Sequence, residues 1–337
     1  MSRLSYQIPN FTYPDTQPGE IFDKVVAQAQ AAEAAGFDRV MVMDHFYQLP
    51  MLGAPDEPMF ECYTMLSALA QHTKDVRLSA LVTGNTYRNP ALLAKTITTL
   101  DHVSHGRATL GIGAGWFEQE HIAYGFDFGT LGERFERLDE ALSIIGFERL
   151  DEALSIIVPM LKGEQPTVDG KFYTAVEAIN SPAPIAPIPI MIGGQGEKKT
   201  LRLVAKYADE SNLTGEIRDI PRKLEALEKH CEDLGRDRAT VSVTKMLMVA
   251  VAPTTEAADA DLKAVAAAKG WNDDIVAMAR QLLIFGDPDT VGEQIAEAMS
   301  LGIDGVALNL PANGHDPERI GLLGDIAQKV IAASGRN

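Results

Sequence analysis

The residues of this chain that are best suited to chemistry stand directly after short apolar segments. One such segment runs into "VMVMDHFYQLP", which places Asp44 and His45 behind an aliphatic run. A histidine in this position can donate a hydrogen bond or exchange a proton near neutral pH. An Asp-His pair is also a common structural hydrogen-bonding pair, so these two residues alone leave both interpretations open.

A second polar group follows the next apolar run, in "LVTGNTYRNPALLAK". Thr83 and Asn85 supply small polar side chains, and Gly84 between them allows a ligand to approach the backbone closely. The Asn89-Pro90 pair marks the start of a helix. The same residues would also make an ordinary turn between a strand and a helix.

Two further segments are rich in glycine. In "LGIGAGWFEQEHIAYGFDFG", the spacing of Gly111, Gly113 and Gly115 does not match a dinucleotide fingerprint, because the last glycine is misplaced and no acidic residue closes the unit about twenty positions later. In "IMIGGQGEKKTLRLVAKYAD", three glycines precede a helix that carries Lys198 and Lys199. Backbone N–H groups at such a helix start, flanked by cations, suit one phosphate group. A plain glycine turn is the alternative.

These residues need a scaffold, and the pattern of the chain predicts one. Short runs rich in β-branched and aliphatic residues alternate with longer amphipathic helical patterns. The eight runs are Leu4–Ile8, Arg39–Met43, Arg77–Val82, Ala108–Ile112, Pro189–Ile192, Glu210–Leu213, Val243–Ala250 and Gly305–Leu310. Eight alternations predict an α/β fold, a closed (β/α)8 TIM barrel spanning 1–337, with a doubly wound open sheet as the competing architecture. In such a barrel the reactive face lies at the C-terminal ends of the strands.

Three segments depart from the regular alternation. Turn residues and alternating apolar positions predict a hairpin insertion at 162–189, and residues 253–285 form a predicted helical insertion. Residues 135–157 contain the phrase "FERLDEALSII" twice, separated by Gly146. A shift of twelve residues turns a helical stripe by about 120°, so one straight helix could not press both copies onto the same barrel. We therefore expect a bend, an overhang or a second surface, on an outer helix away from the reactive face.

The composition excludes several classes of partner. The net charge of −17 repels nucleic acid and anionic lipid surfaces. Because no stretch approaches the roughly 18 apolar residues of a membrane span and no signal peptide is recognisable, we expect a cytoplasmic protein with no membrane partner. Cys62 and Cys231 lack the spacing of a metal site, so no metal is expected. The expected partner is a small-molecule substrate, with a homo-oligomer possible.

Taken together, four segments resemble the luciferase-like monooxygenase superfamily, and in particular its branch of oxidoreductases that depend on coenzyme F420, a deazaflavin. They are "GFDRVMVMDHF", "TYRNPALLAKTITTLDHVSHGRATLGIGAGWFEQEHIAYGFDF", "IPIMIGGQGEKKTLRLVAKYADESN" and "FGDPDTVGEQIAEAMSLGIDGVALNLP". The match covers nearly the whole chain in the right order. The resemblance implies a (β/α)8 barrel with insertions and hydride transfer between the deazaflavin and a small organic substrate.

The resemblance also implies the roles of particular residues. His45 would be the catalytic acid/base and would share contact with the cofactor ring with Asp44. A non-prolyl cis peptide bond, matched to Ala80–Leu81, would lie behind the ring. The other residues expected to bind the cofactor are Thr83, Asn85, Ala114, Gly115 and Trp116 at the ring, and Gly193, Gly194, Gln195, Gly196 and Glu197 at its phosphate.

Trp116 stands where the sugar-phosphate dehydrogenases of the superfamily carry a catalytic glutamate. Because its indole cannot carry a proton, the resemblance favours reduction of an apolar or conjugated substrate over oxidation of a sugar phosphate. Trp116 could equally be a packed lid of the cofactor pocket. Two alternatives for the whole protein remain: an FMN-dependent luciferase-like monooxygenase supplied by a separate flavin reductase, and a non-catalytic barrel that only binds cofactor.

Overall fold

The computed structural model describes residues 3–127, 140–269, 276–277, 280 and 283–335; of residues 140–145 it describes only the helical backbone. Within these residues eight parallel strands form a closed barrel, in which β10 pairs with both β9 and β12, and β12 pairs with β1. The eight strands are β1 (Leu4–Ile8), β2 (Arg39–Val42), β3 (Arg77–Ala80), β5 (Ala108–Gly113), β8 (Ile190–Gly193), β9 (Glu210–Leu213), β10 (Ser242–Val251) and β12 (Gly305–Asn309). Closure confirms the predicted (β/α)8 barrel and rules out the open sheet.

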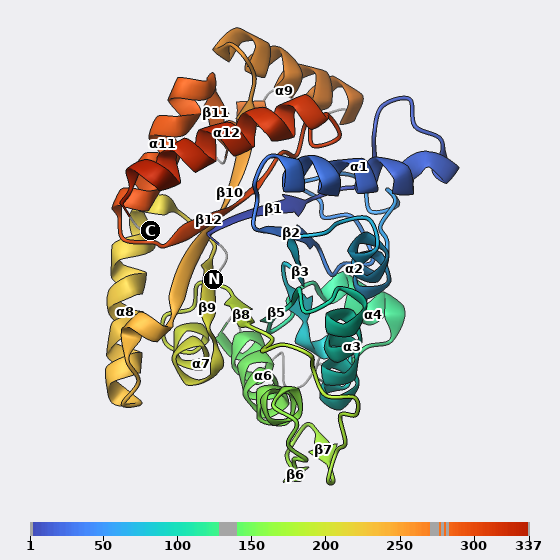
Figure 1. The fold of residues 1–337 in the computed structure, drawn as a ribbon, viewed down its shortest axis with the longest axis vertical. Helices are drawn as coiled ribbons and strands as arrows, with labels where there is room; N and C mark the ends of the chain where they lie inside the picture. The colour runs from blue at the N-terminus through green and yellow to red at the C-terminus, as the bar shows by residue number, and fades with distance from the viewer. Residues whose placement is uncertain (1–2, 128–139, 270–275, 278–279, 281–282, 336–337) are drawn as a thin grey trace.

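Helices cover the outside of the barrel (Figure 1). They are α1 (Ile21–Ala34), α2 (Cys62–Ala70), α3 (Pro90–Val103), α4 (Glu118–Tyr124), α6 (Glu140–Leu161), α7 (Thr200–Tyr207), α8 (Ile220–Asp233), α9 (Thr255–Lys269), α11 (Pro288–Ser300) and α12 (Pro317–Ala333). Several begin as the sequence predicts. Asn89 caps α3 by accepting the N–H groups of Ala91 and Leu92, with Pro90 in the first turn. No helix among the described residues has the length and hydropathy needed to cross a membrane.

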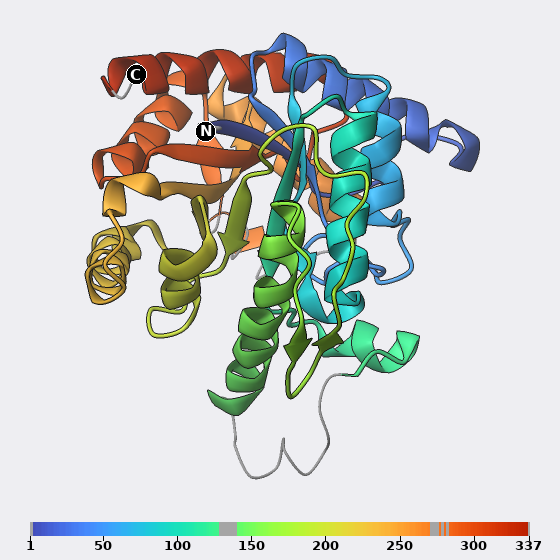
Figure 2. The same cartoon turned by 60° about the horizontal axis from the view of Figure 1, so that its bottom comes forward.

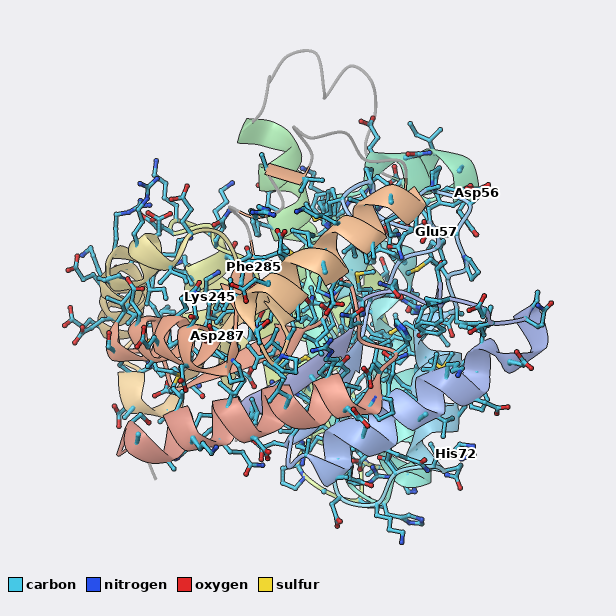
Figure 3. The ribbon with its side chains drawn as sticks, turned by 90° about the horizontal axis from the view of Figure 1, so that it is seen from above. Asp56, Glu57, His72, Lys245, Phe285 and Asp287 are labelled. Carbon is cyan, nitrogen blue, oxygen red and sulfur yellow. The ribbon has the colours of Figure 1, made fainter. Side chains whose placement is uncertain are left out.

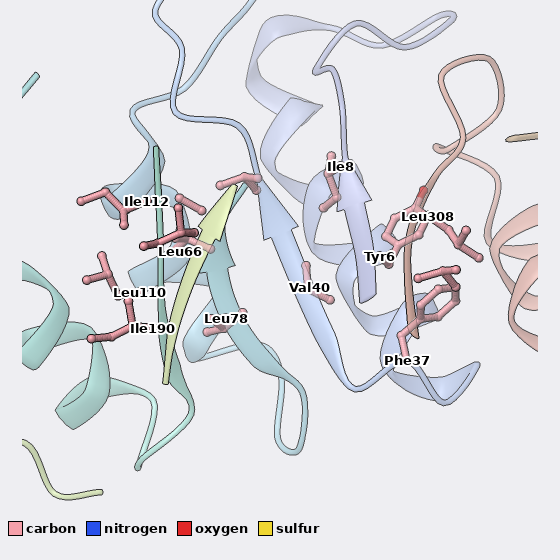
Figure 4. Packing of buried hydrophobic residues seen from close by; sticks show 14 of the residues in the cluster. Tyr6, Ile8, Phe37, Val40, Leu66, Leu78, Leu110, Ile112, Ile190 and Leu308 are labelled. Atoms are coloured by element: carbon pink, nitrogen blue, oxygen red, sulfur yellow. The ribbon is translucent and has the colours of Figure 1, made fainter. Parts of the chain in front are cut away.

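The strands are buried on both faces. Side chains such as those of Tyr6, Val40 and Leu110 point outward and pack under the helices, where they form a continuous apolar core (Figure 4). The alternate positions point into the barrel and include a buried ion pair, in which two nitrogens of Arg39 donate to the two carboxylate oxygens of Glu210 at 3.0 and 2.7 Å. A buried pair with this geometry is stable only while both partners are present.

The predicted hairpin segment contains the antiparallel strands β6 (Val168–Asp169) and β7 (Thr174–Ala175). Figures 1 and 2 both show this hairpin beside α6, and the Glu152 carboxylate of α6 accepts the backbone N–H of Phe172 at 2.8 Å. The predicted helical insertion contains α9 and ends at strand β11 (Ile284–Gly286). Its residues 270–275, 278–279 and 281–282 lie outside the described residues.

The second copy of the duplicated phrase, and residues 140–145 of the first, belong to α6, which runs through Gly146 without a break. The second copy packs on the barrel, because its Leu150, Leu154 and Ile157 are fully buried. Of the first copy, residues 135–139 lie outside the described residues. The junction is not remote from the barrel mouth, since a Cβ built on Gly146 would lie 3.4 Å from the Cβ of Ala114, after strand β5.

Candidate active site

The predicted site residues lie at or after the C-terminal ends of four successive barrel strands, and so they lie on one face of the barrel. The ends of these strands meet tightly at Val82. A Cβ built on Gly113 would lie 2.8 Å from Val82 Cγ2, and one built on Gly193 would lie 2.8 Å from Val82 Cγ1. Glycine is therefore required at both strand ends, because any side chain there would displace Val82 from between them.

Asp44 is held by a cation and is not free to act as an acid or a base. Its two carboxylate oxygens accept from Arg88 Nη1 at 2.6 Å and Nη2 at 3.0 Å, and one of them also accepts the backbone N–H of Gly84 at 3.1 Å. Burial pushes the pKa of Asp44 upward, against Arg88 and the Gly84 N–H. Burial also opposes the charge of Arg88, but the Asp44 carboxylate outweighs it and raises the pKa of Arg88. With both oxygens occupied by N–H donors, the two residues form an ion pair that ties the ends of β2 and β3 together.

His45 has a different partner, the fully buried carboxylate of Glu120 on α4. Glu120 Oε2 lies 2.9 Å from His45 Nδ1 and accepts the Tyr87 hydroxyl at 2.5 Å, while Oε1 accepts the backbone N–H groups of Phe46 and Tyr47 at 2.5 and 2.8 Å. Burial raises the pKa of Glu120, but the hydrogen bonds from His45 and Tyr87 outweigh it, so the pKa lies below the ordinary 4.5. An ionised Glu120 can only accept, so His45 Nδ1 carries a hydrogen and its Nε2 remains for another molecule.

Aromatic rings surround this imidazole. The ring centroid of His45 lies 5.8 Å from that of Trp116 and 5.8 Å from that of Phe117, both in edge-to-face arrangements. The side chain of His45 is 13% exposed, whereas Trp116 is 63% exposed. His45 is thus accessible but fixed, and Trp116 offers an uncovered aromatic face next to it.

The residues after β3 form the floor of the same region. Thr83 is fully buried and its hydroxyl is hydrogen-bonded to that of Tyr63. Asn85 begins a short 3-10 turn (Asn85–Tyr87) and is also buried, with Nδ2 3.5 Å from the Tyr173 hydroxyl. Its Oδ1 has no hydrogen-bond partner among the described residues. A buried acceptor of this kind is costly unless a ligand or water donates to it.

One predicted detail of this region is wrong by one residue. The non-prolyl cis peptide bond joins Leu81 and Val82, not Ala80 and Leu81. The reason lies in the strand pairing, because the N–H of Leu81 still donates to the carbonyl of Val42 at 2.9 Å, which continues the β2–β3 ladder past Ala80. The chain leaves the ladder only after Leu81.

The glycine loop of residues 193–197 joins β8 to α7. Gly194 has φ +134°, in the region that favours glycine, and its N–H donates to the carbonyl of Asn212. In the part of the chain that the structure describes, the backbone N–H groups of Gln195, Gly196 and Glu197 meet no acceptor. Three free N–H groups in one loop before a helix are donors of the kind that bind a phosphate group.

The structure assembles the predicted residues but adds two that the sequence did not single out, Glu120 and Arg88. Glu120 lies 75 positions after its partner His45, in the first turn of a helix, where an acid is unremarkable. Arg88 precedes the capping Asn89 in a polar loop, which was the available signal for a charge at a strand end. Among the described residues, no group of three or more His, Cys, Asp or Glu side chains is arranged to hold a metal ion.

Comparison with known proteins matches residues 2–305 to the sequence profile of the luciferase-like monooxygenases. An F420-dependent glucose-6-phosphate dehydrogenase of Microbacterium testaceum is 28% identical over 327 residues, which cover 90% of each chain. Among solved structures, an F420-dependent secondary alcohol dehydrogenase in complex with an F420-acetone adduct has a TM-score of 0.75 at 18% identity, covering 98% of this chain and 99% of that one. The oxygenating constituent of 3,6-diketocamphane monooxygenase from Pseudomonas putida, in complex with FMN, has a TM-score of 0.71 at 19% identity, with coverage of 98% and 99%.

Proposed function

Because this chain belongs to the luciferase-like monooxygenase family, we propose that it is an oxidoreductase that binds coenzyme F420 and transfers a hydride between the deazaflavin and a small organic substrate. The relative from Microbacterium testaceum, similar over nine-tenths of both chains, is named an F420-dependent dehydrogenase. The observation within the structure that carries the proposal is the His45–Glu120 pair at the barrel mouth, on the same face as the glycine loop.

The residues present fit such a cofactor at two points. Asn85 Oδ1, a buried acceptor without a partner among the described residues, would accept an N–H from the edge of a deazaflavin ring. The three free N–H groups of Gln195, Gly196 and Glu197 would hold its phosphate. When bound, the deazaflavin supplies a hydride-carrying carbon and reacts poorly with oxygen.

The chain's own contribution is to place a proton. Glu120 fixes the hydrogen of neutral His45 on Nδ1, so that Nε2 can take a proton from a substrate hydroxyl during oxidation. In the reverse direction, protonated His45 would return a proton from Nε2 to a carbonyl oxygen. The backbone N–H groups of Phe46 and Tyr47 hold the Glu120 carboxylate in turn, so the imidazole is oriented by an acceptor that is itself fixed.

Trp116 bears on the class of substrate. Its exposed ring beside His45 would stack on a planar or apolar substrate and carries no acid or base that could act on a sugar. We propose an apolar or conjugated alcohol, or the corresponding carbonyl compound. Among the remaining expected ring contacts, Gly115 fits tightly, because a Cβ built there would lie 2.6 Å from Thr86 Oγ1.

The test is a titration of the purified protein with F420 and, separately, with FMN, followed by fluorescence and by oxygen consumption with reduced flavin. We expect F420 to bind more tightly than FMN and no oxygen consumption. Tighter binding of FMN with flavin-dependent oxygen uptake would favour the monooxygenase alternative instead. Once a substrate is found, His45→Ala should lower kcat far more than it weakens F420 binding, whereas a non-catalytic barrel would show no turnover with any variant.

A further inference from the structure

Two buried lysines next to the barrel mouth are not used by the proposed hydride transfer. Lys223 lies in the first turns of α8 and Lys245 on β10, and they are only 3% and 2% exposed. Their hydrogen bonds go to neutral oxygens. Lys223 Nζ donates to Gln195 Oε1 at 2.8 Å, and Lys245 Nζ donates to the carbonyl of Gly215 at 2.6 Å. Figure 3 labels Lys245, on the opposite side of the view from His72.

The two ammonium groups face one another across Gly215. The carbonyl of Gly215 accepts from Lys245, and a Cβ built on Gly215 would lie 3.4 Å from Lys223 Nζ and 2.0 Å from Gln195 Oε1. Gly215 has φ +80°, which brings its backbone between the two side chains. Among the described residues, no carboxylate forms an ion pair with either lysine within 4.0 Å.

The charges further away do not neutralise the pair. Asp219, directly before α8, and Glu197, in the glycine loop, act on Lys223 from a distance, but both also pair with the exposed side chain of Arg222. Burial lowers the pKa of Lys245 to about 8, and the charge of Lys223 adds to this effect; burial also lowers the pKa of Lys223. Two desolvated like charges without a counter-charge are unfavourable in an acidic protein that could have supplied a carboxylate.

We propose that Lys223 and Lys245 form a binding subsite for an anionic group, a phosphate or a carboxylate, beside the C-terminal end of β9, where Lys245 of β10 pairs with Leu213. Each ammonium has three N–H donors and gives two of them to neutral oxygens, Lys223 to Gln195 and Thr214 and Lys245 to Gly215 and Met246, so one donor on each remains for an anion. Gln195, which is bound to Lys223, belongs to the glycine loop, so an anion held here is adjacent to the proposed cofactor phosphate. The anion could belong to the cofactor or to the substrate, and the subsite itself does not depend on the proposed function.

The experiment measures thermal unfolding against increasing inorganic phosphate at constant ionic strength, with chloride as the balancing anion. The proteins are wild type, Lys223→Met, Lys245→Met and a matched control, Lys229→Met, which alters an exposed lysine on the same helix. We expect phosphate to raise the Tm of wild type and of the control, and to leave both buried-lysine variants unchanged. In chloride alone, Lys245→Met should be at least as stable as wild type, because it removes a desolvated charge. Lys245→Gln serves as a second variant of similar size.

A second measurement identifies the source of the anion by comparing F420 with its deazaflavin core that lacks the phosphate and the glutamates. If the anion is part of the cofactor, the buried-lysine variants should bind F420 at least about tenfold more weakly and bind the core as wild type does. If F420 binding is unchanged while phosphate binding is lost, the anion belongs to the substrate. Wild type that does not respond to phosphate, or lysine variants that respond as the control does, would overturn the subsite. Failure of the proposed function is separate, because it would show as absent F420 binding in wild type.

Discussion

Replacing Glu120 by glutamine is the most informative perturbation of the site, because it changes one atom that two side chains share. Glu120 Oε2 contacts His45 Nδ1 and the Tyr87 hydroxyl, whereas Oε1 contacts two backbone N–H groups. In Glu120→Gln, Oε1 can still accept from the backbone, but the amide NH2 in the other position can only donate. His45 Nδ1 must then become an acceptor, and its hydrogen must move to Nε2.

The expected loss of stability follows from the same four hydrogen bonds. A hydrogen bond to a charged group contributes about 1.5–3 kcal/mol and a neutral one about 0.5–1.5 kcal/mol, so each loses about 1 kcal/mol when the charge is removed. Part of this loss of free energy is offset because a neutral amide costs less to bury than a carboxylate. We expect the free energy of unfolding to fall by about 2–4 kcal/mol, with the fold retained.

The assay is nitrogen NMR of protein labelled in its histidine rings, combined with denaturant unfolding. The resonances of His45 are assigned with a His45→Gln variant. At a pH where the imidazole is neutral, wild type should show the Nδ1–H tautomer and Glu120→Gln the Nε2–H tautomer. Glu225→Gln, which changes an exposed carboxylate on α8, should give the wild-type tautomer and the wild-type stability. Persistence of the Nδ1–H form in Glu120→Gln would refute the argument that Glu120 sets the tautomer.

Three further predictions concern the framework. Arg88→Met leaves Asp44 buried without its cation and should lower the free energy of unfolding by about 3–5 kcal/mol in urea; a loss below about 1 kcal/mol would contradict the ion pair. The pKa of Glu120 is lowered in the folded protein, so its ionised form adds to the free energy of unfolding well above pH 4.5, and this contribution is lost as the pH falls through the folded pKa. Between pH 6 and 3 the free energy of unfolding should therefore fall less steeply in Glu120→Gln than in wild type. Gly146→Ala should raise the free energy of unfolding by about 0.5–1 kcal/mol, because Gly146 is inside a helix with room for a Cβ. Gly111→Ala should lower it strongly, because the new Cβ would lie 2.1 Å from the carbonyl oxygen of Ala80. Equal effects of the two substitutions on urea unfolding would contradict the packing described.

The sequence predicts the barrel well because strand and helix periodicity are local properties. Each predicted run coincides with one barrel strand, with ends that differ by at most two residues. The strand ends carry the polar and glycine residues, and parallel closure then brings them to one face without further information. The placement of Asp44, His45 and the glycine loop on that face follows from this topology alone.

Partners across the barrel mouth were not predictable in the same way. His45 pairs with Glu120 and not with the adjacent Asp44, because Arg88 occupies both oxygens of Asp44. Which carboxylate His45 contacts depends on how α4 packs against the turn after β3, and no local sequence pattern predicts that packing. Lys245 did leave a signal, a single charge within the apolar strand "VTKMLMVAV", but its neighbour Lys223 is on a different element.

The duplicated phrase shows how tertiary contacts choose between two identical segments. Either copy could form the helix between β5 and β8, since both present the same apolar stripe. The register of α6 is fixed, however, because Glu152, in the middle of the helix, accepts backbone N–H groups of the β6–β7 hairpin, and the hairpin follows the helix after only a short connection. In a continuous helix the first copy would lie twelve residues upstream, about 18 Å along the axis and about 120° around it, so it would not make these contacts in the same register. The second copy therefore packs on the barrel, and Gly146, at the junction between the two copies, lies next to Ala114 after strand β5.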